Sequence, residues 1–184
     1  MSTVEFSHIA STYIENMDGL YAYALHMGFD DQTSMDAIHD VFYKLCIRHS
    51  SLDEIENLKS YLFRALRNRL VDLKRSNREI PSLFTANEKN EEILSFNLNV
   101  TVEDELILKE DSDEIRRKVE TVLNRLTHRQ REIIYLRYIQ ECSYDEISDI
   151  MNISIAASRN LVNRSFVKLK EAMLTISLFI FIIK

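Results

Sequence analysis

Glycine and proline are nearly absent from the 184-residue sequence, which has 2 Gly, 1 Pro and no Trp. Gly and Pro supply most of the turns that connect β-strands, so their scarcity argues against a β fold. Hydrophobic residues make up 46% of the chain and recur at spacings of three and four, the period of helices with one buried face. The sequence therefore predicts an all-α protein, long enough for one large domain or two small ones.

Cysteine is also scarce, with 2 residues in the chain. Cys46 and Cys142 lie far apart within apolar helical patterns, which predicts reduced core thiols in a cytoplasmic protein. The first residues are polar and acidic and do not resemble a signal peptide. His39 has no second His or Cys at metal-ligand spacing, and the sequence has no nucleophile–base set or Gly-rich phosphate loop. We therefore expect no enzyme activity, no metal and no cofactor.

Three helix starts follow one another between residues 126 and 173. Thr127 and Ser143 each precede a Gln or Glu by three residues, which is the capping-box spacing. Asn152 tolerates a left-handed backbone and is expected to close the short second helix, and Ser154 caps a longer third one. Two short helices joined by about three residues, with a long helix behind them, predict a helix-turn-helix, whose second helix enters the DNA major groove.

The helix that follows Ser154 is predicted to have one inner and one DNA-facing side. Amide and guanidinium side chains read base edges in the major groove, although a polar stripe alone is also typical of a solvated face. The turn spacing, the caps and the local charge together favour DNA. The expected inner side holds Ala157, Ser158, Leu161, Ser165, Phe166 and Leu169. The expected DNA side holds Ala156, Arg159, Asn160, Asn163 and Arg164, with Lys168 as a contact that is not base-specific.

The net charge of −6 is unusual for a DNA-binding protein, but the positive charge is concentrated in two places. Residues 61–80 hold 6 basic and 2 acidic side chains, and residues 126–184 hold 8 and 6. Residues 1–60 and 81–125 are acidic, with 3 basic against 10 acidic and 6 against 11. Local basic patches still allow specific DNA contact.

The same period predicts three helices in the N-terminal half. They are expected at 4–27, after residues 30–32, and from about 57 to 75, with a polar loop at 48–56. The third helix has a basic stripe opposite its apolar face, while Arg69 falls among the apolar residues, where its stem can pack and its head can reach solvent. Such a stripe suits a nucleic-acid backbone and equally a solvated surface. Its members are Arg64, Arg67, Asn68, Arg75 and Arg78.

Two stretches resemble the sigma-70 family of transcription initiation factors. SMDAIHDVFYKLC and IENLKSYLFRALRNRLVDLKRS are similar to the second conserved region of that family. LTHRQREIIYLRYIQECSYDEISDIMNIS, with the long helix behind it, resembles the fourth region. Two regions joined by a short linker are similar to the extracytoplasmic-function (ECF) subfamily. The resemblance covers roughly residues 6–78 and 106–173.

The resemblance implies two small helical domains and a division of labour between them. Residues 1–78 would bind RNA polymerase core and the minus-ten element, 79–105 would form an acidic flexible linker, and 106–173 would bind the minus-thirty-five element. It implies that loop 48–56 captures a flipped base. By position, Asp36, His39, Asp40 and Phe42 would contact core polymerase, and Arg64, Arg67, Asn68 and Arg75 would face the melted strand. The implied partners are core polymerase and promoter DNA, and an anti-sigma factor is left open.

Two other functions are consistent with parts of the sequence. The chain could be a helix-turn-helix regulator that acts as a dimer without core polymerase, or a membrane-peripheral protein that uses the apolar tail 174–184. The tail is too short to cross a bilayer, which needs about 20 residues. We expect it to extend the recognition helix and to dock on an apolar surface, slightly in favour of this chain's own first domain over a second copy or an inhibitory partner.

Overall fold

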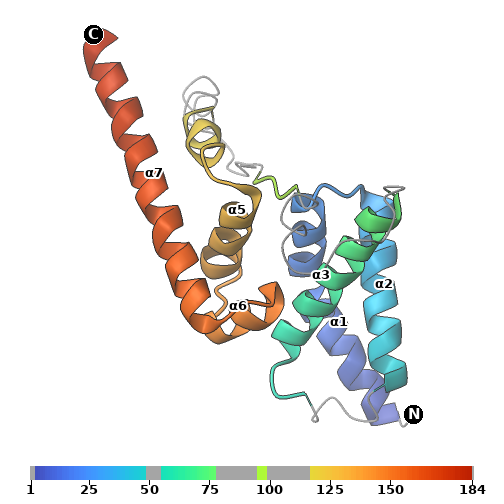
Figure 1. Cartoon of the computed structure of the whole chain (residues 1–184). Coiled ribbons are helices and arrows are strands. Elements are labelled where there is room, and N and C mark those ends of the chain that lie inside the picture. The colour runs from blue at the N-terminus through green and yellow to red at the C-terminus, as the bar shows by residue number, and fades with distance from the viewer. Residues whose placement is uncertain (1–2, 49–54, 78–94, 99–116, 184) are drawn as a thin grey trace.

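The computed structural model describes residues 3–48, 55–77, 95–98 and 117–183, and every regular element in these ranges is a helix (Figure 1). The predicted all-α class is therefore confirmed. The N-terminal half consists of α1 (Thr3–His26), α2 (Asp31–Arg48) and α3 (Leu58–Asn77). In the C-terminal half, a helical stretch at 117–123 precedes α5 (His128–Ile134), the π-helical segment η3 (Tyr135–Ile139), α6 (Tyr144–Met151) and α7 (Ile155–Ile183).

The turn between α1 and α2 is made by two residues that suit it. Gly28 has φ +81, a left-handed conformation that costs a glycine little, and it ends α1 where the sequence predicted. Asp30 caps the start of α2. Its carboxylate accepts hydrogen bonds from the Thr33 backbone N–H at 2.8 Å and from the Thr33 hydroxyl at 2.9 Å. These bonds lower the pKa of Asp30, which is the expected effect of donors that favour the charged form.

Large apolar side chains from both halves of the chain form one continuous core. The helices of the N-terminal half contribute residues at helical spacing, and their buried faces are those that the sequence pattern predicted. In the N-terminal half the core includes Leu20, Ala24, Ile38, Val41, Leu45, Leu62, Leu66 and Leu70. In the C-terminal half it includes Ile133, Leu136, Ile147, Ile150 and Val162.

The two halves pack directly on each other, with α3 against α6 (Figure 1). The two predicted helical regions are therefore present, and they contact each other in this conformation. Most of the predicted linker, 79–105, lies outside the described residues, but its segment 95–98 is packed between the halves. The exact domain boundaries stay a prediction.

The apolar tail continues α7 to Ile183, as predicted. The C-terminal end of this helix points away from α1, α2 and α3 (Figure 1), so the expectation that the tail docks on the first domain is not met in this conformation. Met173 and Leu174, at the start of this stretch, are largely exposed. Among the described residues, no helix is both long and apolar enough to span a membrane.

Candidate nucleic-acid interface

The helix-turn-helix forms as its local signals predicted. Thr127 and Ser143 each make a complete capping box, at the starts of α5 and α6. Asn152 takes the left-handed conformation, with φ 52 and ψ 54, and ends α6. The Ser154 hydroxyl accepts a hydrogen bond from the Ala157 N–H at 3.1 Å and so caps α7. Short-range hydrogen bonds thus fix the angle between α6 and α7.

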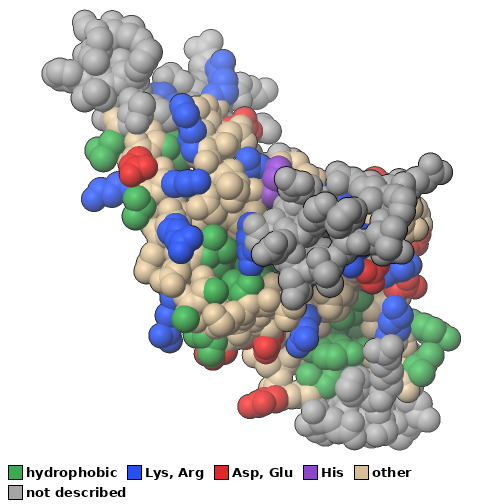
Figure 2. All heavy atoms as spheres, viewed as in Figure 1, with side chains coloured by type: hydrophobic (Ala, Val, Ile, Leu, Met, Phe, Trp, Pro, Cys, Tyr) green, Lys and Arg blue, Asp and Glu red, His purple; other side chains and the backbone are tan. Residues whose placement is uncertain are grey.

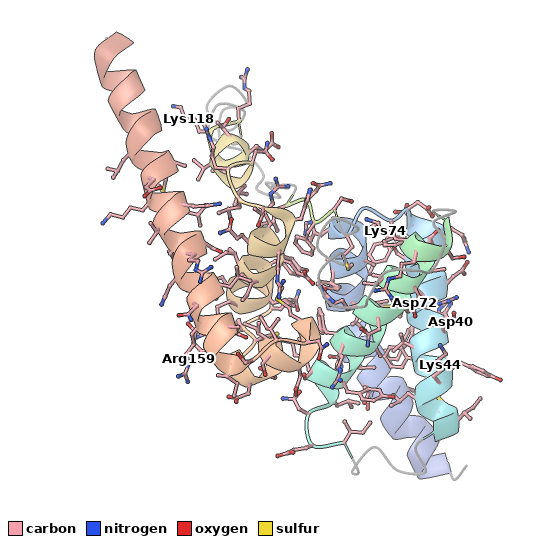
Figure 3. The ribbon with its side chains drawn as sticks, viewed as in Figure 1. Asp40, Lys44, Asp72, Lys74, Lys118 and Arg159 are labelled. Atoms are coloured by element: carbon pink, nitrogen blue, oxygen red, sulfur yellow. The ribbon has the colours of Figure 1, made fainter. Side chains whose placement is uncertain are left out.

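The predicted DNA-reading residues lie on the free side of the first turns of α7. Arg159, Asn160, Asn163 and Arg164 are all exposed. Figure 3 shows Arg159 projecting from this helix, and its guanidinium lies 5.5 Å from the centre of the Tyr144 ring on α6. Figure 2 shows further Lys and Arg side chains spaced along the α7 side of the molecule. This face is positively charged and open to a ligand.

The buried face of α7 matches the predicted one in part, since Ser158, Leu161, Ser165 and Leu169 are buried or half-buried. Ala157 and Phe166 were expected inside, but both are exposed, Phe166 at 45%, and Val162 is buried instead. Ser158 and Ser165 are fully buried, and their hydroxyls donate to the carbonyl oxygens four residues earlier, at 3.1 and 2.7 Å. Because these serines are small and their hydroxyls are satisfied, they fit the closely packed side of α7, which contacts α5 and α6. The Phe166 ring instead covers Tyr138 edge-on, at 5.3 Å between centroids.

Lys168 lies further along α7. Its ammonium donates to the Gln130 side-chain oxygen at 3.1 Å, and that oxygen also accepts the Thr127 N–H of the capping box. The side chain is exposed, so it remains able to contact a phosphate.

On α2, three of the four predicted polymerase-binding residues are accessible. Asp36 and His39 are exposed, and Asp40 is half-exposed and pairs with Arg69 at 2.7 Å (Figure 3). Phe42 is only 6% exposed and packs edge-on against Tyr13, 4.9 Å between ring centroids. The Phe42 ring thus belongs to the core and supports the helix from beneath, and its predicted role in polymerase binding stays a prediction.

The basic stripe on α3 is split by the structure. Arg64, Asn68 and Arg75 are exposed, and Arg75 lies 3.8 Å from Asp72. Arg67 instead faces the C-terminal half. Its predicted contact with a melted strand is not available in this conformation, because the guanidinium is already bound. Loop residues 49–54, which were expected to capture a flipped base, lie outside the described residues.

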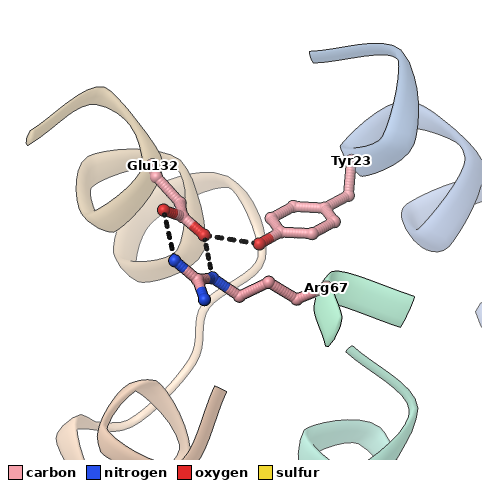
Figure 4. Close-up of polar contacts among 3 residues, drawn as sticks. All are labelled: Tyr23, Arg67 and Glu132. Carbon is pink, nitrogen blue, oxygen red and sulfur yellow. Dashed lines mark hydrogen bonds and ion pairs between the residues drawn. The ribbon is translucent and has the colours of Figure 1, made fainter. Parts of the chain in front are cut away.

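Arg67 is bound by Glu132 of α5 (Figure 4). Its Nε donates to Glu132 Oε1 at 2.7 Å and its Nη2 approaches Oε2 at 3.4 Å. The hydroxyl of Tyr23, from α1, donates to the same Oε1 at 2.6 Å. Burial lowers the pKa of Arg67, but the Glu132 carboxylate more than offsets this and leaves it raised. Burial, reinforced by the charge of Glu132, raises the pKa of Tyr23 well above its ordinary value. Arg67 thus stays charged and Tyr23 stays neutral at neutral pH.

Neither Glu132 nor the segment 95–98 was identified from the sequence. Phe96 is 1% exposed, although the surrounding stretch is polar and acidic. The spacing of Glu132 could have indicated its burial, because it lies four residues before Leu136 and therefore on the buried face of the helix. A charge on an apolar face indicates a buried partner, but the sequence does not say which one.

Other reactive groups do not assemble into a site. Cys46 and Cys142 are free, and burial raises the pKa of Cys142 to about 11, which makes its thiol unreactive at neutral pH. Across the described ranges, no His, Cys, Asp and Glu side chains cluster as metal ligands would.

Comparisons with known proteins agree with this arrangement. The family model described as "Sigma-70 region 2" matches residues 12–80, and the model described as "Sigma-70, region 4" matches residues 116–169. The chain is 26% identical over 171 residues to the ECF RNA polymerase sigma factor SigM of Bacillus subtilis, which covers 88% of this chain and 93% of SigM. It is 27% identical over 154 residues to the RNA polymerase sigma factor SigZ of the same organism, covering 83% of this chain and 79% of SigZ.

Two solved structures share the fold. The sigma factor RpoE of Bartonella quintana, in complex with the anti-sigma factor NepR, aligns with a TM-score of 0.60 at 21% identity, over 89% of this chain and 95% of that one. CnrH, in complex with the cytosolic domain of CnrY, aligns with a TM-score of 0.57 at 18% identity, over 91% and 88%. With regions 2 and 4 matched in this order in one chain, the protein belongs to the sigma-70 family and to its ECF subfamily.

Proposed function

We propose that this chain acts as a dissociable initiation subunit of bacterial RNA polymerase, which binds core and directs it to specific promoters. The observation that carries the proposal is the match to region 2 ahead of region 4, with the recognition face of α7 exposed. Sigma factors are not enzymes, so in this proposal the polymerase supplies all the chemistry, and the protein works beside it in the cytoplasm.

Upstream recognition is assigned to the exposed side of α7. Arg159 and Arg164 can donate bidentately to guanine, and Asn160 and Asn163 can pair with adenine. Lys168 lies about two turns further on and suits a phosphate, which adds affinity without sequence information. The rigid turn at Asn152 supports this role, because base contacts require a fixed helix orientation.

Downstream recognition is assigned to the exposed part of the α3 stripe. Arg64, Asn68 and Arg75 lie on one side of the helix and can follow a single-stranded backbone. Arg67 lies on the same stripe, and its guanidinium can contact the strand once it separates from Glu132. Core binding is assigned to Asp36, His39 and Asp40 on the exposed side of α2. An anti-sigma partner is a further candidate, since the two similar solved structures are complexes with other proteins.

The deciding experiment is promoter-specific run-off transcription with purified core polymerase. Core alone should give no specific transcript, and core with this chain should give one whose start depends on both promoter elements. A helix-turn-helix regulator, the alternative, would bind a palindromic duplex as a dimer without core and give no transcript. Specific duplex binding without any initiation on cognate promoters would therefore overturn the proposal.

A further inference from the structure

We infer that the free chain holds itself closed, with Arg67 withheld from single-stranded DNA by Glu132 and Tyr23, and that the segment 95–98 fastens this state. The inference rests on the proposed function, because it assigns a regulatory state to the same downstream surface. Its elements are named here the lock (Tyr23, Arg67 and Glu132) and the strap (residues 95–98).

The lock joins three helices that are remote in sequence. The Arg67 side chain is 15% exposed and that of Glu132 is 3% exposed, so both charges have lost most of their water. Each buried ion then needs the other, because an unpaired charge in such a place is strongly disfavoured. Arg67 cannot bind a DNA phosphate while it keeps these bonds, and Glu132 loses its partner if Arg67 leaves. DNA and Glu132 are therefore competitors for one guanidinium.

A second set of contacts ties the start of α3 to the helix-turn-helix. The Asn57 amide donates to Glu146 Oε1 at 2.8 Å, and the Ser60 hydroxyl lies 3.5 Å from the Glu146 carbonyl oxygen. The Lys59 ammonium donates to the carbonyl oxygen of Gln140. These bonds hold the start of α3 against the C-terminal half.

The strap fills an aromatic socket with the Phe96 ring. The ring centroids of Tyr23, His26 and Tyr135 lie 5.7, 5.7 and 5.4 Å from that of Phe96. Tyr23 and His26 come from α1 and Tyr135 from η3, so the ring bridges the two halves. Tyr23 belongs to the lock and the socket at once, and this couples the two.

Backbone contacts fix the strap on both sides. The Asn97 N–H donates to the His26 carbonyl oxygen at 2.7 Å, and Lys74 of α3 donates to the Ser95 hydroxyl at 2.8 Å. From the other half, Arg131 of α5 donates to the Phe96 carbonyl oxygen at 3.0 Å. A linker segment that only connected two domains would have no need of these bonds.

The closed state blocks one DNA site and spares the other. The reading face of α7 stays exposed, whereas Arg67 on α3 is covered. The free factor should therefore bind upstream duplex normally and downstream single strand poorly. A protein whose competent state is only partly populated shows an affinity reduced by that fraction, so opening should raise single-strand affinity alone.

Two variants open the molecule without touching a DNA-contacting residue. Glu132→Gln removes the counter-ion of Arg67, and Phe96→Ala empties the socket. Glu141→Gln is the matched charge control, since this carboxylate is exposed on the same half. Met173→Ala, at an exposed position on α7, is the matched apolar control. Circular dichroism checks that each variant stays helical.

The measurement is fluorescence anisotropy of the free factor with a single-stranded minus-ten oligonucleotide and with an upstream duplex, alongside the radius of gyration from small-angle scattering. We expect both opening variants to bind the single strand about tenfold more tightly or better, to expand, and to keep their duplex affinity, while both controls match the parent. Parental single-strand affinity and parental size in folded Glu132→Gln and Phe96→Ala would overturn the inference. Run-off with core separates the proposals: open variants without transcripts contradict the proposed function alone, and transcripts without opening contradict this inference alone.

Discussion

Asn160 and Lys168 both project from the exposed side of α7, but their side chains recognise different parts of DNA. An amide can pair with one adenine edge, a contact that discriminates against a wrong base by about 1–3 kcal/mol. An ammonium contacts phosphate, whatever the sequence. We expect Asn160→Ala to lose discrimination at one upstream position, and Lys168→Ala to weaken all sequences evenly and reduce the slope of log affinity against log salt by about 1. Identical base-substitution profiles for the two variants would contradict this assignment.

His26 makes the closed state sensitive to acid. Burial lowers its pKa below 6.5, outweighing the hydrogen bond from its Nδ1–H to the Asn97 carbonyl oxygen at 2.7 Å. The open state exposes this ring and restores its ordinary pKa, so the open state binds more protons as the pH falls through about 6.5. Acidification should therefore open the molecule, down to the lower pKa of the closed form.

The check on His26 is the radius of gyration of the free factor between pH 7.5 and 5.5. Tyr135 faces the ring, at 4.8 Å between centroids, and burial raises its pKa, so it stays neutral throughout. Arg131 and His128 reach the same strap through the Phe96 carbonyl oxygen. His26→Gln should reduce the increase in the radius of gyration on acidification. An unchanged increase in that variant would show that other groups cause the expansion.

The polar face of α3 was predictable from the sequence, but the fate of Arg67 was not. The helical period correctly groups Arg67 with Arg64 and Asn68. It carries no information about which other helix covers that face, and Glu132 lies 65 positions further along. The residues predicted on the outer side of α7 are exposed in the structure, and their role in DNA recognition stays a prediction.

At the scale of elements, the local signals predicted well where hydrogen bonds are local. The two capping boxes and the end of α6 involve partners three or four residues apart, so short sequence patterns determine them. The π-helical segment Tyr135–Ile139 has no such signal. On α7 the pattern correctly placed Ser158 and Ser165 inside. It did not predict that Val162 is buried or that Phe166 is exposed and packs against Tyr138, because a hydrophobic period does not identify the neighbouring side chains.

Asn152 is the element-scale test of the turn between α6 and α7. Its left-handed backbone costs a residue with a Cβ roughly 1–2 kcal/mol, which Asn and Gly largely avoid. We expect Asn152→Ala to lower the free energy of unfolding by about 1 kcal/mol and Asn152→Gly to leave it equal or higher. Urea denaturation measures both, with Asn163→Ala on an exposed part of α7 as the control. A loss with Gly as large as that with Ala would show that the Asn side chain, not its backbone, closes the helix.

At the scale of the whole molecule, the fold class and the order of the helices could be predicted, but the contact between the halves could not. The strap illustrates why. Residues 79–105 are acidic and lack helical periodicity, which is the composition of a linker, yet Phe96 within them is buried between the two halves. Burial of a side chain of this size contributes about 1.5–3 kcal/mol, comparable to the free-energy differences that populate one conformer over another.

Deleting the apolar tail distinguishes closure by the lock and strap from closure by docking of the tail, which the sequence suggested. If the tail held the molecule closed, removing residues 174–184 would raise single-strand binding. In the structure the end of α7 points away from α1, α2 and α3, and the lock and strap lie elsewhere. We therefore expect the truncated chain to keep the parental radius of gyration and, within about twofold, the parental single-strand affinity. Because apolar stretches promote association when they meet water, removing this one should also reduce self-association in sedimentation velocity. Tighter single-strand binding after truncation, with helical content retained, would show that the tail contributes to closure.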